Sequence, residues 1–60
     1  MQESAIMNIN QAVKKLPHNV KVILIQDRHP DMPQDEIVSN AANPKSQVLR
    51  QALAYHGFLV

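Results

Sequence analysis

The sequence of 60 residues is long enough for one small domain, residues 1–60. A chain of this length buries only about 60% of the surface that its unfolded form exposes, so a domain of this size has a small core. It contains no cysteine, which excludes disulfides and thiolate zinc sites, and only one Tyr and one Phe, too few for reading single strands by base stacking. The apolar fraction of 45% is that of a globular protein, and a net charge of +1 points to no particular partner.

The first predicted element is a helix over residues 4–16. Apolar residues recur there at steps of three and four: Ala5, Ile6, Ile9, Val13 and Leu16. Ser4 is the expected N-cap, and Pro17 ends the helix. Lys14 and Lys15 lie near its C-terminal end, where the helix dipole favours positive charge.

The second predicted element is a short strand over residues 20–25. Four of its six residues are valine or isoleucine, whose stiff side chains favour extended backbone. Alternation would place Val20, Val22 and Leu24 on one face, with Lys21, Ile23 and Ile25 on the other. A helix capped by Asn19 is the rival interpretation. A single strand needs a partner, either the C-terminal tail or a second chain.

A loop is expected at residues 27–33, "DRHPDMP", followed by a short helix over residues 34–42. Pro33 suits the first turn of that helix, and Asp35 and Glu36 lie near the positive end of its dipole. Ile37 and Val38 are its expected buried residues.

The last predicted helix covers residues 43–56. Asn43 and Pro44 are its expected N-cap and first-turn pair, and Gly57 is its expected stop. Its buried stripe is Val48, Leu49, Ala52 and Leu53.

The pattern therefore predicts a mainly helical domain with one short strand, in the order helix, strand, helix, helix. An all-α arrangement of four helices is the alternative. The expected core is Ile6, Ile9, Val13, Leu16, Val22, Leu24, Ile37, Val38, Val48, Leu49, Leu53 and Phe58.

Residues suited to catalysis are few. Asp27, His29 and Asp31 stand at alternate positions and could in principle face a metal, but a solvated, proline-bounded loop explains them better. A single glycine excludes a phosphate-binding loop, and no serine has a base at a recognisable spacing. We expect no enzyme activity, no metal and no cofactor.

Recognition of DNA is the function that the sequence favours. Residues 37–60 contain no acidic residue, as a surface facing phosphates requires. The outward positions of the last helix would be Lys45, Ser46, Gln47, Arg50 and Gln51. Arginine can pair with guanine and glutamine with adenine, while lysine and serine suit phosphates. Lys14 or Lys15 would contact the DNA backbone. An exposed helix of any protein also needs a polar face, which is the competing explanation.

The order of elements resembles the first part of a winged-helix domain, a relative of helix-turn-helix proteins. In that family the first strand lies between the first two helices, and the recognition helix leads into a wing hairpin through a segment similar to "ALAYHGFLV". The resemblance implies that residues 34–42 and 43–56 are the helix-turn-helix pair of a small transcriptional regulator. The sequence departs from the family after Val60, where no residues remain for a second wing strand.

A second resemblance is to ribbon-helix-helix proteins, dimers that read DNA with a paired strand. "KVILIQ" would be that strand, followed by two helices, the later one containing "KSQVLRQAL". The apolar Ile23 and Ile25 on its outward face depart from the polar surface that base reading needs.

The alternative function is a small protein-interaction or inhibitor module. It would dimerise, or add its 20–26 strand to the sheet of a partner. A homodimer is the expected assembly, and a different protein is the possible partner under the alternative function. The longest apolar run, Val22 to Ile25, is too short to cross a membrane, and the N-terminus lacks a signal pattern, so we expect a cytoplasmic protein.

Overall fold

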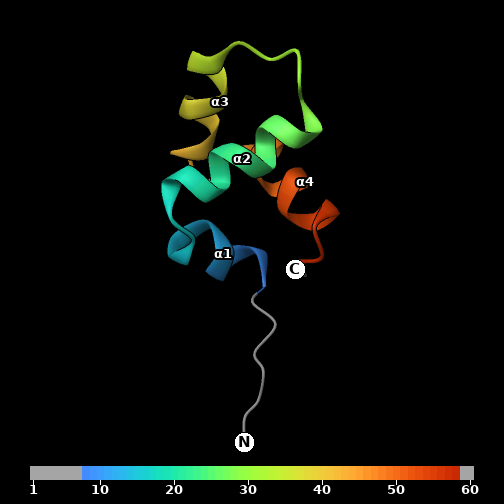
Figure 1. The fold of residues 1–60 in the computed structure, drawn as a ribbon. Helices are drawn as coiled ribbons and strands as arrows, with labels where there is room; N and C mark the ends of the chain where they lie inside the picture. Colours follow the sequence, from blue (N-terminus) through green and yellow to red (C-terminus); the bar gives the residue numbers. More distant parts are fainter. Residues whose placement is uncertain (1–7, 59–60) are drawn as a thin grey trace, which may run out of the picture.

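The computed structural model describes residues 8–58, which form four helices joined by short connections (Figure 1). They are α1 (Ile9–Lys15), α2 (His18–Arg28), α3 (Gln34–Ala41) and α4 (Gln47–Tyr55). The all-α alternative is therefore confirmed, and the helix, strand, helix, helix order is wrong. None of these helices is long and apolar enough to cross a bilayer.

The strand predicted at residues 20–25 is wrong because this segment is the centre of α2. The helix buries Ile25 completely and leaves Ile23 61% exposed, whereas strand alternation would have placed both on one face. The preference of valine and isoleucine for strands is weak, and packing against neighbouring elements overrides it. α2 begins after Pro17 rather than at Asn19, and no side chain caps it.

α1 is shorter than predicted at its N-terminal end. Asn8 is the N-cap: its side chain accepts a hydrogen bond from Gln11 N at 2.8 Å, and Gln11 Oε1 accepts one from Asn8 N at 3.2 Å. These reciprocal bonds form a capping box and start the helix at Ile9. Ser4 and Ile6, the predicted cap and core residues, lie outside the described residues.

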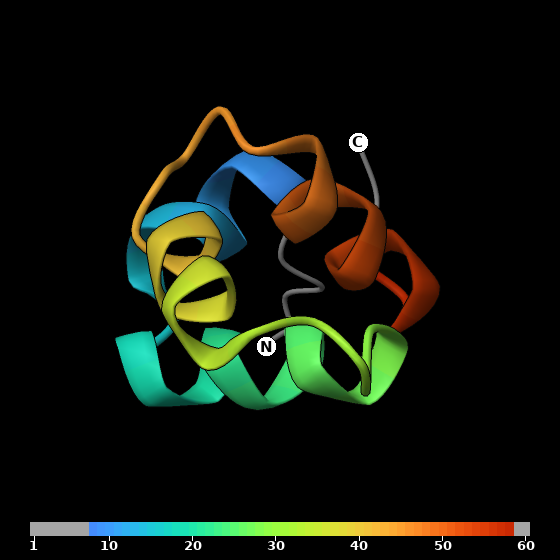
Figure 2. The ribbon, with the colours of Figure 1, turned by 90° about the horizontal axis from the view of Figure 1, so that it is seen from above.

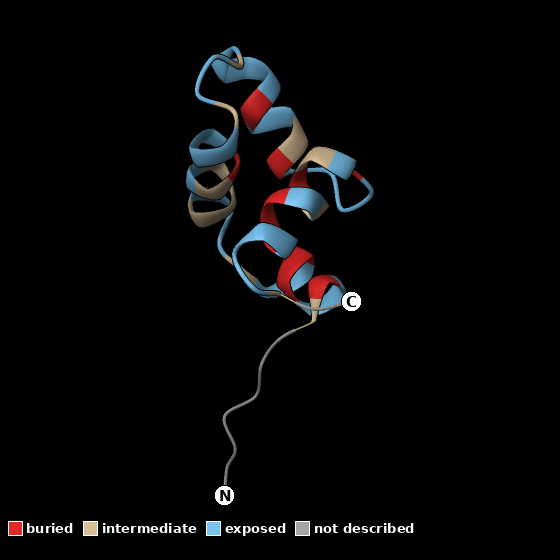
Figure 3. Cartoon of the chain, turned by 90° about the vertical axis from the view of Figure 1, so that its right-hand side faces the viewer, coloured by how far each residue is buried: buried red, intermediate tan, exposed pale blue. Residues whose placement is uncertain are grey.

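α2 crosses the middle of the fold and packs against both α3 and α4, while α1 packs against α4 (Figures 1 and 2). The buried residues face the space that the four helices enclose (Figure 3). They are Ile9, Ala12, Val13, Ile25, Ile37, Ala41, Leu49, Ala52 and Leu53. The three alanines Ala12, Ala41 and Ala52 are fully buried, so they allow the helix backbones to approach closely.

Most of the predicted core is confirmed. Five predicted residues are buried, and five more are partly buried against them: Leu16, Val22, Leu24, Val48 and Phe58. Val38 is the exception at 40% exposed, because the buried side of α3 passes through Ile37 and Ala41.

Gly57 ends α4 as predicted. Its φ of +99° lies where other residues are strained, and this turn lets Gly57 N donate to Ala54 O and Phe58 N to Leu53 O. The two bonds form a Schellman motif, which satisfies carbonyls at the helix end and returns Phe58 to the core.

Candidate nucleic-acid interface

The turn between α3 and α4 is held by a chain of side-chain hydrogen bonds. Asn40 Nδ2 donates to Glu36 O at 2.8 Å, and the Ser46 hydroxyl donates to Asn40 Oδ1 at 2.5 Å. The same hydroxyl oxygen accepts from Leu49 N at 3.1 Å, as an N-cap does. The last turn of α3 and the first turn of α4 are therefore joined through one hydroxyl group.

Two predictions about this turn are wrong. Asn43 is not the N-cap of α4, since its side chain instead accepts from Lys45 N at 3.0 Å, an arrangement that favours a turn. Ser46 is the N-cap and is only 6% exposed, so it does not face outward as a DNA-binding residue. Its hydroxyl is used entirely in organising the turn.

The outward face of α4 carries two glutamine amides. Gln47 and Gln51 are both exposed and lie one helical turn apart, opposite the buried Leu49. Ala54 extends this face toward the C-terminal end, and Tyr55 lies at its margin, 62% exposed. Within the described residues, α4 has no carboxylate, so this face offers donors and amides only.

Arg50 lies at the other margin of that face. It is partly buried. Its Nε donates to Pro44 O at 3.0 Å, so the side chain extends to the residue before Lys45. The bond uses one of the five N–H groups of the guanidinium. Lys45 is exposed in the turn itself. The structure thus places Lys45 and the Arg50 side chain beside the start of α4, with Gln47 and Gln51 along its outward face.

Lys14 and Lys15 are exposed in the last turn of α1. They belong to the helix that packs against α4, and are on a different element from the other predicted DNA-binding residues.

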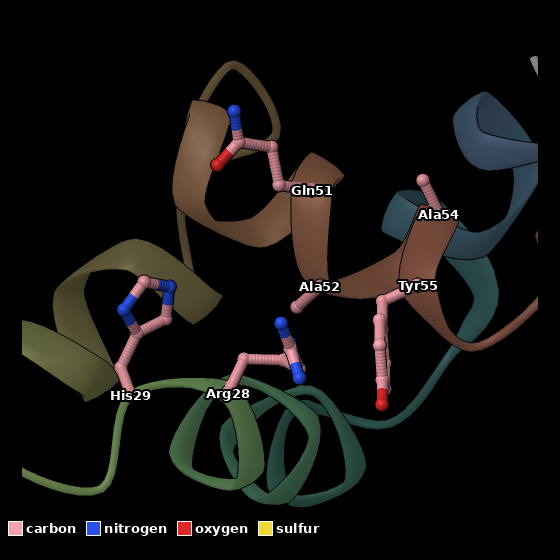
Figure 4. A pocket seen from close by; sticks show the side chains of 6 residues that line it. All are labelled: Arg28, His29, Gln51, Ala52, Ala54 and Tyr55. Atoms are coloured by element: carbon pink, nitrogen blue, oxygen red, sulfur yellow. The ribbon is translucent and has the colours of Figure 1, made fainter.

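A hollow of about 370 Å³ lies between the C-terminal ends of α2 and α4 (Figure 4). Its lining is Arg28, His29, Gln51, Ala52, Ala54 and Tyr55. The Arg28 guanidinium carbon lies 3.6 Å from the centre of the Tyr55 ring, a cation–π contact. Of this lining, the sequence predicted only Gln51 as a binding residue.

A second contact joins the same two helix ends. His56 Nε2 lies 3.5 Å from Asp27 Oδ2, and the His56 ring meets the Tyr55 ring edge-on at 5.3 Å. The Asp27 carboxylate is thus directed to His56. Asp27 is not among the residues that line the hollow, and its walls carry no carboxylate.

The metal-binding pattern considered at Asp27, His29 and Asp31 does not form a site. Within residues 8–58, no group of three histidine, cysteine or acidic residues is arranged to hold a metal ion. No protein-family model, curated protein or solved structure matches the chain.

Proposed function

We propose that this protein is a small, non-enzymatic DNA-binding regulator in which α3 and α4 act as a helix-turn-helix pair. α4 is the helix that enters the major groove. Gln47 and Gln51 read base edges, Arg50 pairs with a guanine, and Lys45 holds a phosphate.

The observation that supports this proposal most is the outward face of α4. It presents two amides one turn apart, flanked by Arg50 and Lys45, with no acidic residue on the helix. Each of these amides can match the donor and acceptor pattern of one adenine in the major groove. An acid on this face would instead repel the phosphates on both sides of the groove.

The way α3 and α4 are joined is consistent with such a pair. α2 packs on both helices. Residues 42–46 connect them, and the hydrogen bond from the Ser46 hydroxyl to Asn40 Oδ1 spans this connection. The connection is slightly longer than the three or four residues usual in helix-turn-helix motifs. A fixed angle between the two helices lets one cross the backbone while the other lies in the groove.

The test is the affinity of the full chain for a labelled mixed-sequence duplex, measured by fluorescence anisotropy at several salt concentrations. Affinity should fall steeply with salt, because each bound phosphate releases counterions. Lys45→Gln should weaken binding to all duplexes and lower the salt slope by about one. Gln26→Ala, on the exposed side of α2, is the matched control and should bind as the parent does. A chain that binds no duplex at low salt would refute the proposal.

A second candidate function, protein interaction, is favoured by Ile23. This side chain is 61% exposed on α2, opposite the buried Ile25. Addition of residues 20–26 to a sheet is excluded as the mechanism because they are helical. A second copy of the chain or another protein would instead dock on the outer face of α2.

Light scattering after size exclusion distinguishes this candidate. If the chain dimerises through α2, Ile23→Lys should yield a folded monomer. Ile25→Lys cannot serve for this purpose, because a charge at a completely buried position unfolds the protein. A parent chain that is monomeric at high concentration would contradict self-association through this face.

A further inference from the structure

The hollow beside α4 has walls suited to an anion. Its polar lining consists of the Arg28 guanidinium, the His29 imidazole, the Gln51 amide and Tyr55, with no carboxylate among them. Figure 4 shows Arg28 pointing toward the Tyr55 ring, with His29 on the other side of Arg28 and the Gln51 amide pointing away from it. Groups from two helices therefore border one open space.

Arg28 is oriented by Tyr55. Because the ring contacts the face of the guanidinium, the N–H groups in the plane of the guanidinium stay directed along its edges. Among the described residues, none of those N–H groups donates to a protein acceptor in the structure, and the carboxylate of the adjacent Asp27 lies 3.5 Å from His56 Nε2. A planar guanidinium held in this way can bind two oxygens of one anion side by side.

The ligand that best fits these groups is a phosphate. A guanidinium edge and an imidazole can donate to different oxygens of a tetrahedral anion, whereas a carboxylate has only two oxygens to offer. The hollow, at about 370 Å³, has room for more than an isolated phosphate, as a phosphodiester with its sugar requires.

The position of Gln51 suggests where this phosphate comes from. Gln51 borders the hollow and also lies on the outward face of α4, so a strand read by α4 passes beside Arg28. We propose that the hollow bordered by Arg28, His29 and Gln51 is a phosphate-binding site filled by a phosphodiester of the bound duplex. This inference rests on the proposed function. Contacts of this kind fix the register of a protein on DNA without reading sequence.

The experiment compares the parent chain with Arg28→Gln, Arg28→Lys and Tyr55→Leu. Duplex affinity is measured against salt, and each variant is first shown to be folded by its urea unfolding midpoint. Arg28→Gln should lower affinity several-fold for every duplex and reduce the salt slope by about one. Arg28→Lys should retain the slope because it retains the charge. Tyr55→Leu should keep the slope but weaken binding, since the guanidinium loses its fixed orientation.

Titration with inorganic phosphate, followed by the NMR signal of the Arg28 Nε–H group, separates this site from the proposed function. If the parent binds duplex with a salt slope that Arg28→Gln leaves unchanged, the phosphate site is refuted and DNA binding stands. If duplex does not bind but inorganic phosphate shifts the Arg28 signal, DNA binding by α4 and the phosphodiester as ligand are both refuted. If neither ligand has an effect, both proposals fail.

Discussion

The Ser46 hydroxyl donates to Asn40 Oδ1 at 2.5 Å and thereby connects the N-cap of α4 to the last turn of α3. Because the same oxygen accepts from Leu49 N, one small side chain both begins a helix and fixes its connection to the preceding one. The orientation of α4, the helix proposed to enter the major groove, therefore depends on the buried hydroxyl group of Ser46.

Ser46→Ala should destabilise the protein by about 1–2 kcal/mol, since it removes the N-cap and leaves Asn40 Oδ1 without its donor. Ser39→Ala, at an exposed position of α3, is the control and should change stability by less than about 0.5 kcal/mol. Urea unfolding measures both. A double-mutant cycle with Asn40→Ala should show coupling between the two residues. Additive effects would mean that the hydrogen bond does not hold the turn.

Ile25→Ala and Ile23→Ala should differ strongly. Ile25 is completely buried, so truncation should cost about 2–5 kcal/mol, enough to unfold much of so small a domain. Ile23 is 61% exposed, and its truncation should leave thermal stability nearly unchanged. Circular dichroism of the two variants decides between helix and strand here. Similar losses from both would indicate that they share one buried face, as in a strand.

The Lys21 side chain of α2 donates a hydrogen bond to a backbone carbonyl near the C-terminal end of α1. Its Nζ donates to Val13 O at 3.0 Å in a partly buried position, although the two residues lie on different helices. Lys21→Met keeps the apolar stem but loses this bond, and should cost about 1 kcal/mol. The exposed Lys14→Met provides the comparison and should be nearly neutral in chemical unfolding. Equal effects of the two changes would show that the Lys21 hydrogen bond contributes nothing.

Arg50→Lys tests base reading independently of charge. Lysine cannot donate to Pro44 O and at the same time present a rigid pair of donors to guanine. On a duplex selected for tight binding, the preference for guanine at the contacted position should fall by about 1–3 kcal/mol. The salt slope should stay the same because the charge is retained. A preference that survives the substitution would show that Arg50 reads no base.

The sequence was sufficient to predict α1, α3, α4 and most of the core, because the three- and four-residue spacing of apolar side chains reflects the helix itself. It was misleading at residues 20–25. There the residue preferences favour a strand, whereas the packing of Ile25, Val22 and Leu24 against the core stabilises the helical form. Periodicity alone could not decide this, since α2 has apolar residues on several sides.

The candidate site was predicted only where its residues are neighbours in the chain. Gln47, Arg50 and Gln51 follow from the pattern of α4. Ser46 was expected to face outward because Asn43 was expected to cap the helix. The structure instead starts α4 after Ser46, whose hydroxyl also reaches Asn40. The Arg28–Tyr55 contact joins residues that are distant in sequence. The contact depends on the angle at which α2 crosses α4, and no pattern of neighbouring residues in the sequence predicts that angle.

The contact between α1 and α4 brings together the first and last helices of the described chain. This contact is between helices that are far apart in the sequence. Successive helices, in contrast, are joined by short connections, residues 16–17, 29–33 and 42–46. Because closing a longer loop costs more chain entropy, α2, α3 and α4 should associate first during folding and α1 should dock last. Unfolding should follow the reverse order, so α1 should be the first helix to detach. A transient opening at the N-terminal end would therefore uncover one side of α4 before the rest of the domain unfolds.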